Sequence, residues 1–172
     1  MRVWQTGLLL GFGGLILGAA AVIGVTEFDL RTSTDAFCTS CHTMSMVAAE
    51  RSFQKSSHRH NNFGVVVTCS DCHIPRTSWF TETYTHISKG IRDVIAEQIG
   101  GFRDPAAWTR RRAELASYAI GEMRANESTT CRSCHSASAI EPQSKAGKAA
   151  HATLAQGQIT CVDCHLVHSS AQ

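Results

Sequence analysis

All eight cysteines of this 172-residue chain occur in pairs with one repeated spacing. In each pair two residues separate the cysteines, and a histidine directly follows the second cysteine. The four motifs are Cys38/Cys41/His42, Cys69/Cys72/His73, Cys131/Cys134/His135 and Cys161/Cys164/His165. This spacing is the attachment signature of a c-type haem, in which both thiols form thioethers to the porphyrin and the histidine is placed to ligate the iron. A disulfide framework or a zinc site does not require a histidine after every second cysteine. The spacing therefore predicts four covalently bound haem c groups and a function in electron transfer.

The remaining composition agrees with a haem protein. Aromatic residues make up only 7% of the chain, so the side-chain core should be modest and the porphyrins should supply much of the apolar bulk. The formal charge of +2 omits the haem propionates, so it gives no reason to expect nucleic-acid binding. Covalent haem attachment occurs outside the bacterial inner membrane, which predicts a periplasmic haem region.

The N-terminal segment predicts a membrane anchor. Residues 7–25 are uncharged and mostly apolar, and at about 1.5 Å per residue they nearly cross a hydrocarbon core of about 30 Å. The alternative is a signal peptide cleaved after the alanines at 19–21, but the apolar run continues past them. We expect a single-pass anchor within residues 1–30, with residues 31–172 in the periplasm.

Four glycines of this segment share one helical face: Gly7, Gly11, Gly14 and Gly18. Small residues on one face let helices approach closely in lipid, which predicts pairing of two anchors in a homo-oligomer. Glycine is also simply common in membrane helices, so this alternative stays open.

The haem region contains an internal repeat. The first two motifs begin 31 residues apart and the last two begin 30 apart, and the second motif of each half has Asp between its cysteines. The matching residues before these second motifs are His58, Gly64 and Thr68 in one half and His151, Gly157 and Thr160 in the other. We predict a mostly α-helical multihaem cytochrome c with two dihaem halves, residues 31–77 and 131–172, joined by a helical connector, residues 78–130.

Five histidines lie outside the motifs: His58, His60, His86, His151 and His168. Because His58 and His151 occupy matching repeat positions, we expect both to be sixth ligands of haem iron. His60 aligns with a threonine and is expected to be solvated. His168 lies too close to His165 to reach the far side of the same haem comfortably, so we expect it on a neighbouring haem.

The first motif has methionines after it, at Met44 and Met46, and the other motifs have none nearby. A thioether ligand raises the potential of a haem relative to an imidazole ligand. Met44 is therefore a candidate iron ligand. The alternative is that Met44 packs against the porphyrin while His42 ligates.

Residues 37–44, 58–65, 69–75 and 131–135, after an N-terminal anchor, resemble the membrane-anchored tetrahaem quinol dehydrogenases of the NapC/NirT/NrfH type. The resemblance spans essentially the whole chain. It implies that Met44, rather than His42, ligates haem 1, and that this haem lies at the membrane face where quinol is oxidised.

The resemblance also implies a carboxylate and a lysine beside haem 1. Asp93 matches the carboxylate. The lysine position is His86 here, a departure for which Lys89 could compensate. A second departure concerns His168, since the usual C-terminal ligand lies two residues further from the last motif.

Residues 78–102 show the periodicity of an amphipathic helix. His86, Lys89 and Asp93 share its polar stripe with Glu82 and Glu97, so periodicity alone would favour an ordinary solvent face. Quinol oxidation also releases two protons, which titratable groups must accept, and imidazole can do so near neutral pH. These three residues are therefore the candidate acid–base groups. Residues 103–130 predict a second helix that begins at Asp104 and Pro105.

The sequence thus predicts an inner-membrane cytochrome that oxidises menaquinol or ubiquinol and passes electrons to a periplasmic reductase or a soluble acceptor. Two alternatives remain at this point: a released periplasmic electron shuttle without quinol chemistry, and a haem-based reductase with an open iron position.

Overall fold

The computed structural model describes residues 3–100, 104–157 and 159–165. These residues contain helices and no strand. In chain order the helices are α1 (Val3–Thr32), α2 (Asp35–Cys38), α3 (His42–Ala48), α4 (Arg51–Gln54), α5 (Cys69–His73), α6 (Trp79–Ile99), α7 (Pro105–Ala125), α8 (Thr129–Arg132), the 3₁₀ turn η1 (Ala137–Ala139), α9 (Lys145–Ala155) and the 3₁₀ turn η2 (Cys161–Asp163). The prediction of a mostly α fold is confirmed.

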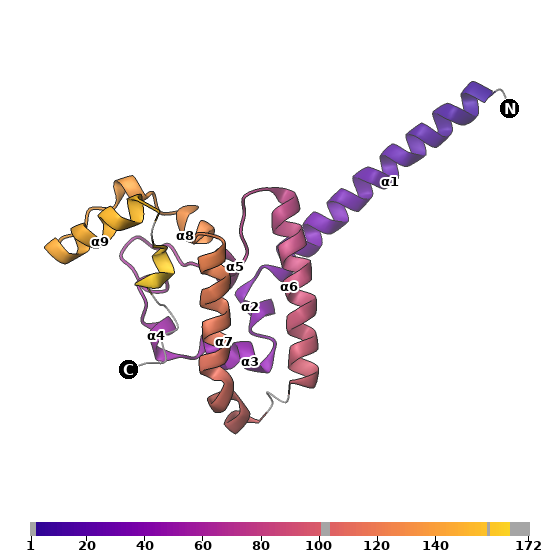
Figure 1. The fold of residues 1–172 in the computed structure, drawn as a ribbon. Helices are drawn as coiled ribbons and strands as arrows, with labels where there is room; N and C mark the ends of the chain where they lie inside the picture. Colours follow the sequence, from indigo (N-terminus) through magenta and orange to yellow (C-terminus); the bar gives the residue numbers. More distant parts are fainter. Residues whose placement is uncertain (1–2, 101–103, 158, 166–172) are drawn as a thin grey trace.

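Helix α1 projects from the body of the protein as a free-standing rod (Figure 1). Its 30 residues correspond to about 45 Å, and it is long and apolar enough to cross a membrane. Thr32 at its last turn is buried. The helix thus continues beyond the apolar run and ends against the body.

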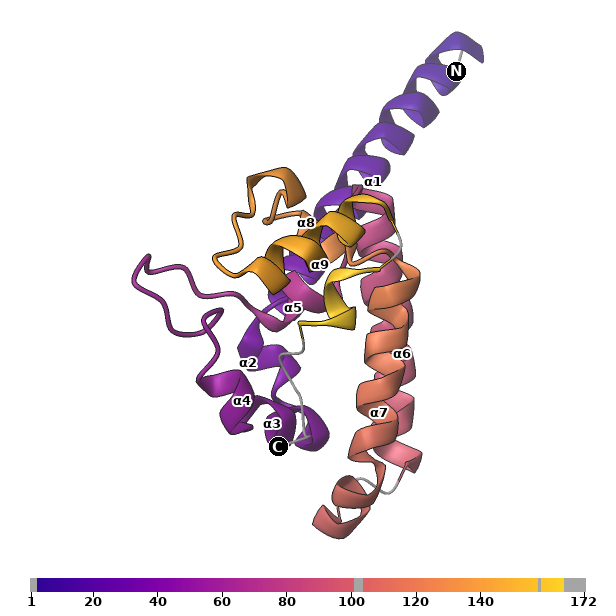
Figure 2. The ribbon, with the colours of Figure 1, turned by 60° about the vertical axis from the view of Figure 1, so that its left-hand side comes forward.

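Helices α6 and α7 lie side by side and form the longest part of the body, as Figures 1 and 2 show. The Ser78 side chain caps α6 by accepting from the Thr81 amide at 3.1 Å, and the Asp104 carboxylate caps α7. Both caps satisfy amides that the helix itself leaves unpaired. The two helices predicted for this region, including the start at Asp104, are present.

The repeat predicted from sequence has the same local structure in both halves. Gly64 and Gly157 have positive φ angles of 71° and 72°, a conformation that glycine adopts without steric cost. Thr68 then forms a capping box with Asp71, and Thr160 forms one with Asp163. In a capping box the threonine side chain accepts from the amide of the acidic residue, and the acidic side chain accepts from the amide of the threonine. This arrangement explains why both second motifs contain Asp.

Few apolar side chains are buried among the described residues. They are Phe53, Ile74, Leu154 and Val162. Ile74 follows the second motif and Val162 lies inside the fourth, so this small core is built around the cysteine motifs. Helix α5 spans the whole second motif, whereas α2, α8 and the 3₁₀ turn η2 each contain only the first cysteine of a motif.

Candidate functional site

The first two motifs lie against each other. The thiols of Cys38 and Cys69 lie close enough for each to shift the other's pKa, which is lowered for Cys38 and raised for Cys69. Asp35 links the two segments: it accepts from the Cys69 amide at 2.8 Å and pairs with Arg59 at 2.6 Å. Burial favours a higher pKa for Asp35, but the Cys69 amide and the Arg59 guanidinium outweigh it and hold the pKa below its usual range. Asp35 is therefore a charged bridge between the two motifs, which the sequence did not single out.

The last two motifs are also neighbours. Cys131 lies close enough to Cys161 to interact electrostatically, and Arg124 on α7 pairs with Asp163 of the fourth motif at 2.6 Å. Between the halves, Cys72 lies close enough to Cys131 to interact electrostatically, and α5 packs on α8. The four attachment motifs thus form a contiguous series in chain order.

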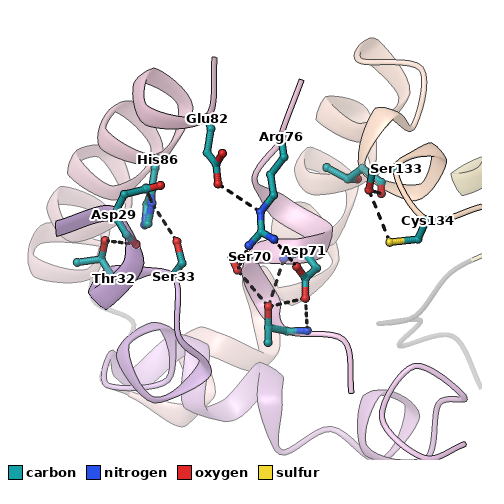
Figure 3. A network of polar contacts seen from close by, with 12 residues as sticks. Asp29, Thr32, Ser33, Ser70, Asp71, Arg76, Glu82, His86, Ser133 and Cys134 are labelled. Carbon is teal, nitrogen blue, oxygen red and sulfur yellow. Dashed lines mark hydrogen bonds and ion pairs between the residues drawn. The ribbon is translucent and has the colours of Figure 1, made fainter. Parts of the chain in front are cut away.

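Two second cysteines, Cys134 and Cys164, differ from the other six cysteines in their exposure. Cys41 is half-buried and is the residue that precedes α3, whereas Cys134 and Cys164 are exposed. The Cys134 sulfur lies 3.8 Å from the Ser133 hydroxyl, as Figure 3 shows. The sequence interpretation treated all eight cysteines as equivalent, and the structure does not place them in equivalent surroundings. Haem attachment at all eight cysteines stays a prediction, and the sulfurs of Cys134 and Cys164 are accessible for thioether formation.

The cysteines are not arranged as a direct metal site. Among the described residues, no group of three or more His, Cys, Asp or Glu side chains could hold a metal ion. A structural zinc ion needs four such ligands around one point. Cysteines spaced along the chain in pairs, each pair followed by a histidine, instead suit a porphyrin that spreads over a larger surface.

Two of the extra histidines face motif histidines. The ring centroids of His58 and His135 are 6.0 Å apart, and those of His151 and His165 are 6.2 Å apart. Imidazole nitrogens bind first-row metal ions at about 2 Å, so two rings on opposite sides of one iron have centroids about 6 Å apart. Among the described residues, the Nδ1 atom of His151 is buried and has no hydrogen-bond partner. The cysteine spacing and both histidine pairs therefore fit haem c.

The other histidine candidates differ in their surroundings. His60 is exposed, in agreement with the sequence interpretation. His73 ends α5, and its carbonyl accepts from Lys89 at 3.2 Å. His168 lies outside the described residues, so the structure does not bear on its predicted role.

The first motif leads directly into α3, which begins at His42 and carries Met44 in its first turn. Glu97 on α6 accepts from the amide of buried Thr43 at 3.3 Å and from its hydroxyl at 2.5 Å. A carboxylate at a helix N-terminus is favourable because amides there lack partners. Helix α6 thereby fixes the segment that holds Met44. The interpretation of the polar stripe as a solvent face is wrong for Glu97.

The three candidate acid–base residues do not form one cluster. His86 is 11% exposed, contacts the Asp29 carboxylate at the end of α1, and lies 3.5 Å from Ser33 Oγ. Figure 3 shows this contact beside the network of Arg76 with Asp71 and Glu82. Sequence reasoning missed Asp29, although its place four residues after the apolar run was a signal that it would lie at the membrane edge.

Lys89 pairs with Glu122 of α7 at 3.1 Å and so connects the two long helices. Asp93 is more open than either, with a side chain 48% exposed. Loss of hydration raises the pKa of Asp93 above its usual value, although the nearby Arg92 opposes the shift. Of the three candidates, Asp93 combines access from outside with a pKa moved toward neutral pH.

Comparison with known sequences gives the same picture. Residues 2–172 match the model of the family described as "NapC/NirT cytochrome c family, N-terminal region". The chain is similar to cytochrome c-type protein TorY of Haemophilus influenzae, with 38% identity over 88% of this chain and 41% of the relative. It is 32% identical to a putative tetraheme cytochrome c of Allochromatium vinosum, over 91% of this chain and 85% of the relative. It is also 32% identical to cytochrome c-type protein NapC of Paracoccus pantotrophus, over 92% and 68%. The chain spans less than half the length of the TorY relative. No solved structure matches it.

Proposed function

Because this chain belongs to the NapC/NirT cytochrome c family, we propose that it oxidises membrane quinol and passes the electrons to a periplasmic reductase or a soluble acceptor. Its cofactors are covalently bound haem c groups, and its role is electron transfer. The observation that carries the proposal is the contiguous series of four motifs, which starts beside the anchor, where α2 packs on α1.

The anchor defines where electrons would enter. In this proposal α1 spans the bacterial inner membrane once and the haem region lies in the periplasm. Helix α1 ends at Thr32 and the first motif begins at Cys38, which supports a first haem that would be the nearest to the membrane. Menaquinol and ubiquinol both reside in the bilayer and would reach this end first. Pairing of two copies through the glycine face of α1 remains part of the proposal.

Each haem iron, when bound, takes up and releases one electron and no proton. The chain must therefore supply the groups that accept the two protons of quinol. Asp93 is suited to this task because its carboxylate is accessible and its raised pKa brings it closer to the pKa of an effective general base. The partly buried Asp29–His86 pair joins α6 to the end of the anchor, and Lys89 joins α6 to α7.

We further propose which residues would ligate the haem irons. His58 would share an iron with His135, and His151 would share one with His165, since the ring separations suit one iron between each pair. Met44 would ligate the first haem in place of His42. His73 and His168 remain the candidates for the second haem.

Reduction by quinol is the direct test. The full-length holoprotein is reconstituted in liposomes, a reduced menaquinone analogue is added without oxygen, and the haem absorption bands are followed. We expect quinol to reduce the haems. Haems that dithionite reduces but quinol does not would indicate the electron-shuttle alternative instead. Reoxidation by nitrite, an N-oxide or hydroxylamine with the purified chain alone would support the reductase alternative.

A further inference from the structure

Helix α6 is oriented the opposite way to an ordinary surface helix. Four of the five side chains on its charged stripe contact other parts of the protein: Glu82 pairs with Arg76, His86 with Asp29, Lys89 with Glu122, and Glu97 with Thr43. A soluble amphipathic helix instead turns its apolar stripe to the core and its charges to water. The charged stripe of α6 is therefore used for packing, and the other face needs a different partner.

The outward face of α6 is apolar. Close to the anchor it presents Phe80 at 77% exposure and Tyr84 at 75%, followed by Ile87. The Trp79 and Phe80 rings meet edge to face, with centroids 5.0 Å apart. Contiguous exposed apolar surface of this kind marks a site of contact with another apolar phase. The mixture of Trp, Tyr and Phe is typical of side chains at the boundary between lipid and water.

The contact with α1 places this surface at a defined depth. The apolar run of α1 ends at Val25, and Asp29 lies four residues further, or about 6 Å along the helix axis. The headgroup layer on each side of a bilayer is about 5–8 Å thick. His86 contacts Asp29 and lies near Ser33, so the adjoining turns of α6 are at headgroup level whenever α1 spans the membrane.

We propose that the N-terminal half of α6 is an interfacial helix, which inserts Phe80, Tyr84 and Ile87 into the boundary between headgroups and acyl chains of the membrane that α1 crosses. Amphipathic helices bind lipid in this way, with their apolar face buried in that boundary. The proposal rests on the anchoring role of α1 given above, but not on quinol oxidation. Two contacts with one bilayer would hold the first motif at a set height above it.

The test uses the full-length holoprotein in liposomes of phosphatidylethanolamine and phosphatidylglycerol. With four haems attached, all eight native cysteines form thioethers, so a single introduced cysteine is the free thiol. The variant is Tyr84→Cys, and the matched control is Ala146→Cys, an exposed position on α9 at the far side of the body from α1 (Figure 1). Each thiol is treated with a charged, water-soluble maleimide, and separate samples receive a benzophenone maleimide followed by light and mass spectrometry.

We expect the Tyr84→Cys thiol to react at least about tenfold more slowly than the control, because an apolar environment raises a thiol pKa and depletes the reactive thiolate. We also expect photoproducts with phospholipid at this position and none at the control. Equal reaction rates without lipid products would overturn the proposal in favour of a solvent face. Cross-links between two protein chains would overturn it in favour of a second copy.

Phe80→Cys is a second variant on the same face and is read in the same way if Tyr84→Cys binds fewer than four haems. Wild-type protein from the same liposomes is assayed for quinol oxidation. Lipid products without quinol oxidation would remove the proposed function and leave the interfacial helix. Quinol oxidation without lipid products would do the reverse.

Discussion

The two halves of the haem region repeat the same turn, but their extra histidines face different partners. Gly64 and Gly157 have nearly identical positive φ angles, and each leads to a threonine–aspartate capping box. Yet His58 of the first half faces His135 of the second half, whereas His151 faces His165 of its own half. Sequence duplication thus preserved the local backbone, while the packing of the halves decided which motif each histidine meets.

The contact of His58 with the second half has a consequence for the path of electrons between the haems. A histidine that belongs to the first half and ligates a haem of the second would connect the two halves across the interface of α5 and α8. In the second half, His151 faces the motif histidine of its own half, so the ligands of that haem would not join the two halves. The first half also differs by its contacts with α1 and α6, so the two copies of the repeat serve different ends of the protein.

Variants of the histidine ligands give the largest expected effect, and they test whether His58 and His151 ligate the haems of the motifs that they face. His58→Ala and His151→Ala should each convert one haem from low spin to high spin, because each removes a strong-field imidazole. Electron paramagnetic resonance counts the converted haems. The double variant His58→Ala/His135→Ala should alter one haem, since both residues serve the same iron. Two altered haems would show that His58 belongs elsewhere. His60→Ala is the control and should leave all four haems unchanged.

The second prediction compares the first motif with the second. Met44→Ala should change the spectrum and potential of one haem and suppress quinol oxidation, because the thioether ligand is lost. His42→Ala should perturb ligation less than His73→Ala does. Redox titration of the visible spectrum measures both effects. Equal loss of ligation in the two histidine variants would establish His42 as the ligand of the first haem.

The third prediction concerns proton transfer at Asp93 on α6. Asp93→Asn should slow quinol oxidation by about 10²- to 10⁴-fold, as expected when a positioned general base is lost. Haem content and reduction by dithionite should stay normal. Because the pKa of Asp93 is raised, wild-type activity should fall with decreasing pH through that pKa, and stopped-flow rates across pH measure this. The asparagine variant should lack this step.

The control for the Asp93 experiment must be a carboxylate that holds no other element in place. Glu97 lies on the same stripe but holds Thr43 at the start of α3, so Glu97→Gln is not a neutral variant. Glu114→Gln is suitable, since Glu114 is exposed on α7 and its ion pair with Arg111 lies within that helix. A wild-type rate in Asp93→Asn would assign the proton acceptor to another residue.

The fourth prediction tests the likeness of the two turns. Gly64→Ala and Gly157→Ala should each destabilise the protein by about 1–2 kcal/mol, because an L-residue is strained in the left-handed region. A Cβ at either position would meet no other atom within 4 Å, so backbone strain accounts for the loss. Denaturant unfolding of the holoprotein measures it. A clear difference between the two variants would show that the turns are not equivalent.

The smallest expected effect is at the capping boxes. Thr68→Ala and Thr160→Ala should each cost about 1 kcal/mol, the usual contribution of an N-cap side chain. The same unfolding measurement applies, with Ser117→Ala at an exposed position of α7 as the control. No change in stability on losing Thr68 would mean that Arg76, which also holds Asp71, maintains that turn without the cap.

Local features were predictable because they depend on neighbours in the chain. The cysteine spacing predicted the haem sites, the apolar run predicted α1, and Asp104 before Pro105 predicted the start of α7. The spacing could not show that Cys134 and Cys164 are exposed while Cys41 is half-buried, since exposure depends on what packs over each motif. The amphipathic period of α6 was also predictable, but which of its two faces packs against the protein was not. Periodicity separates a polar from an apolar face without saying which one packs inward, and the partners of the polar face come from α1, α3 and α7.

The sequence by itself determined that this is a helical chain with four haem-attachment motifs, a hydrophobic N-terminal helix and a repeated turn, because each of these follows from residue types at fixed short spacings. Only the tertiary structure decided that His58 faces His135, that His86 contacts Asp29, and that Glu97 caps α3. The two residues of each pair lie 54 or more positions apart in the chain, and no local pattern encodes them. These contacts arise when helices pack, because a carboxylate or an imidazole that loses contact with water needs another polar partner.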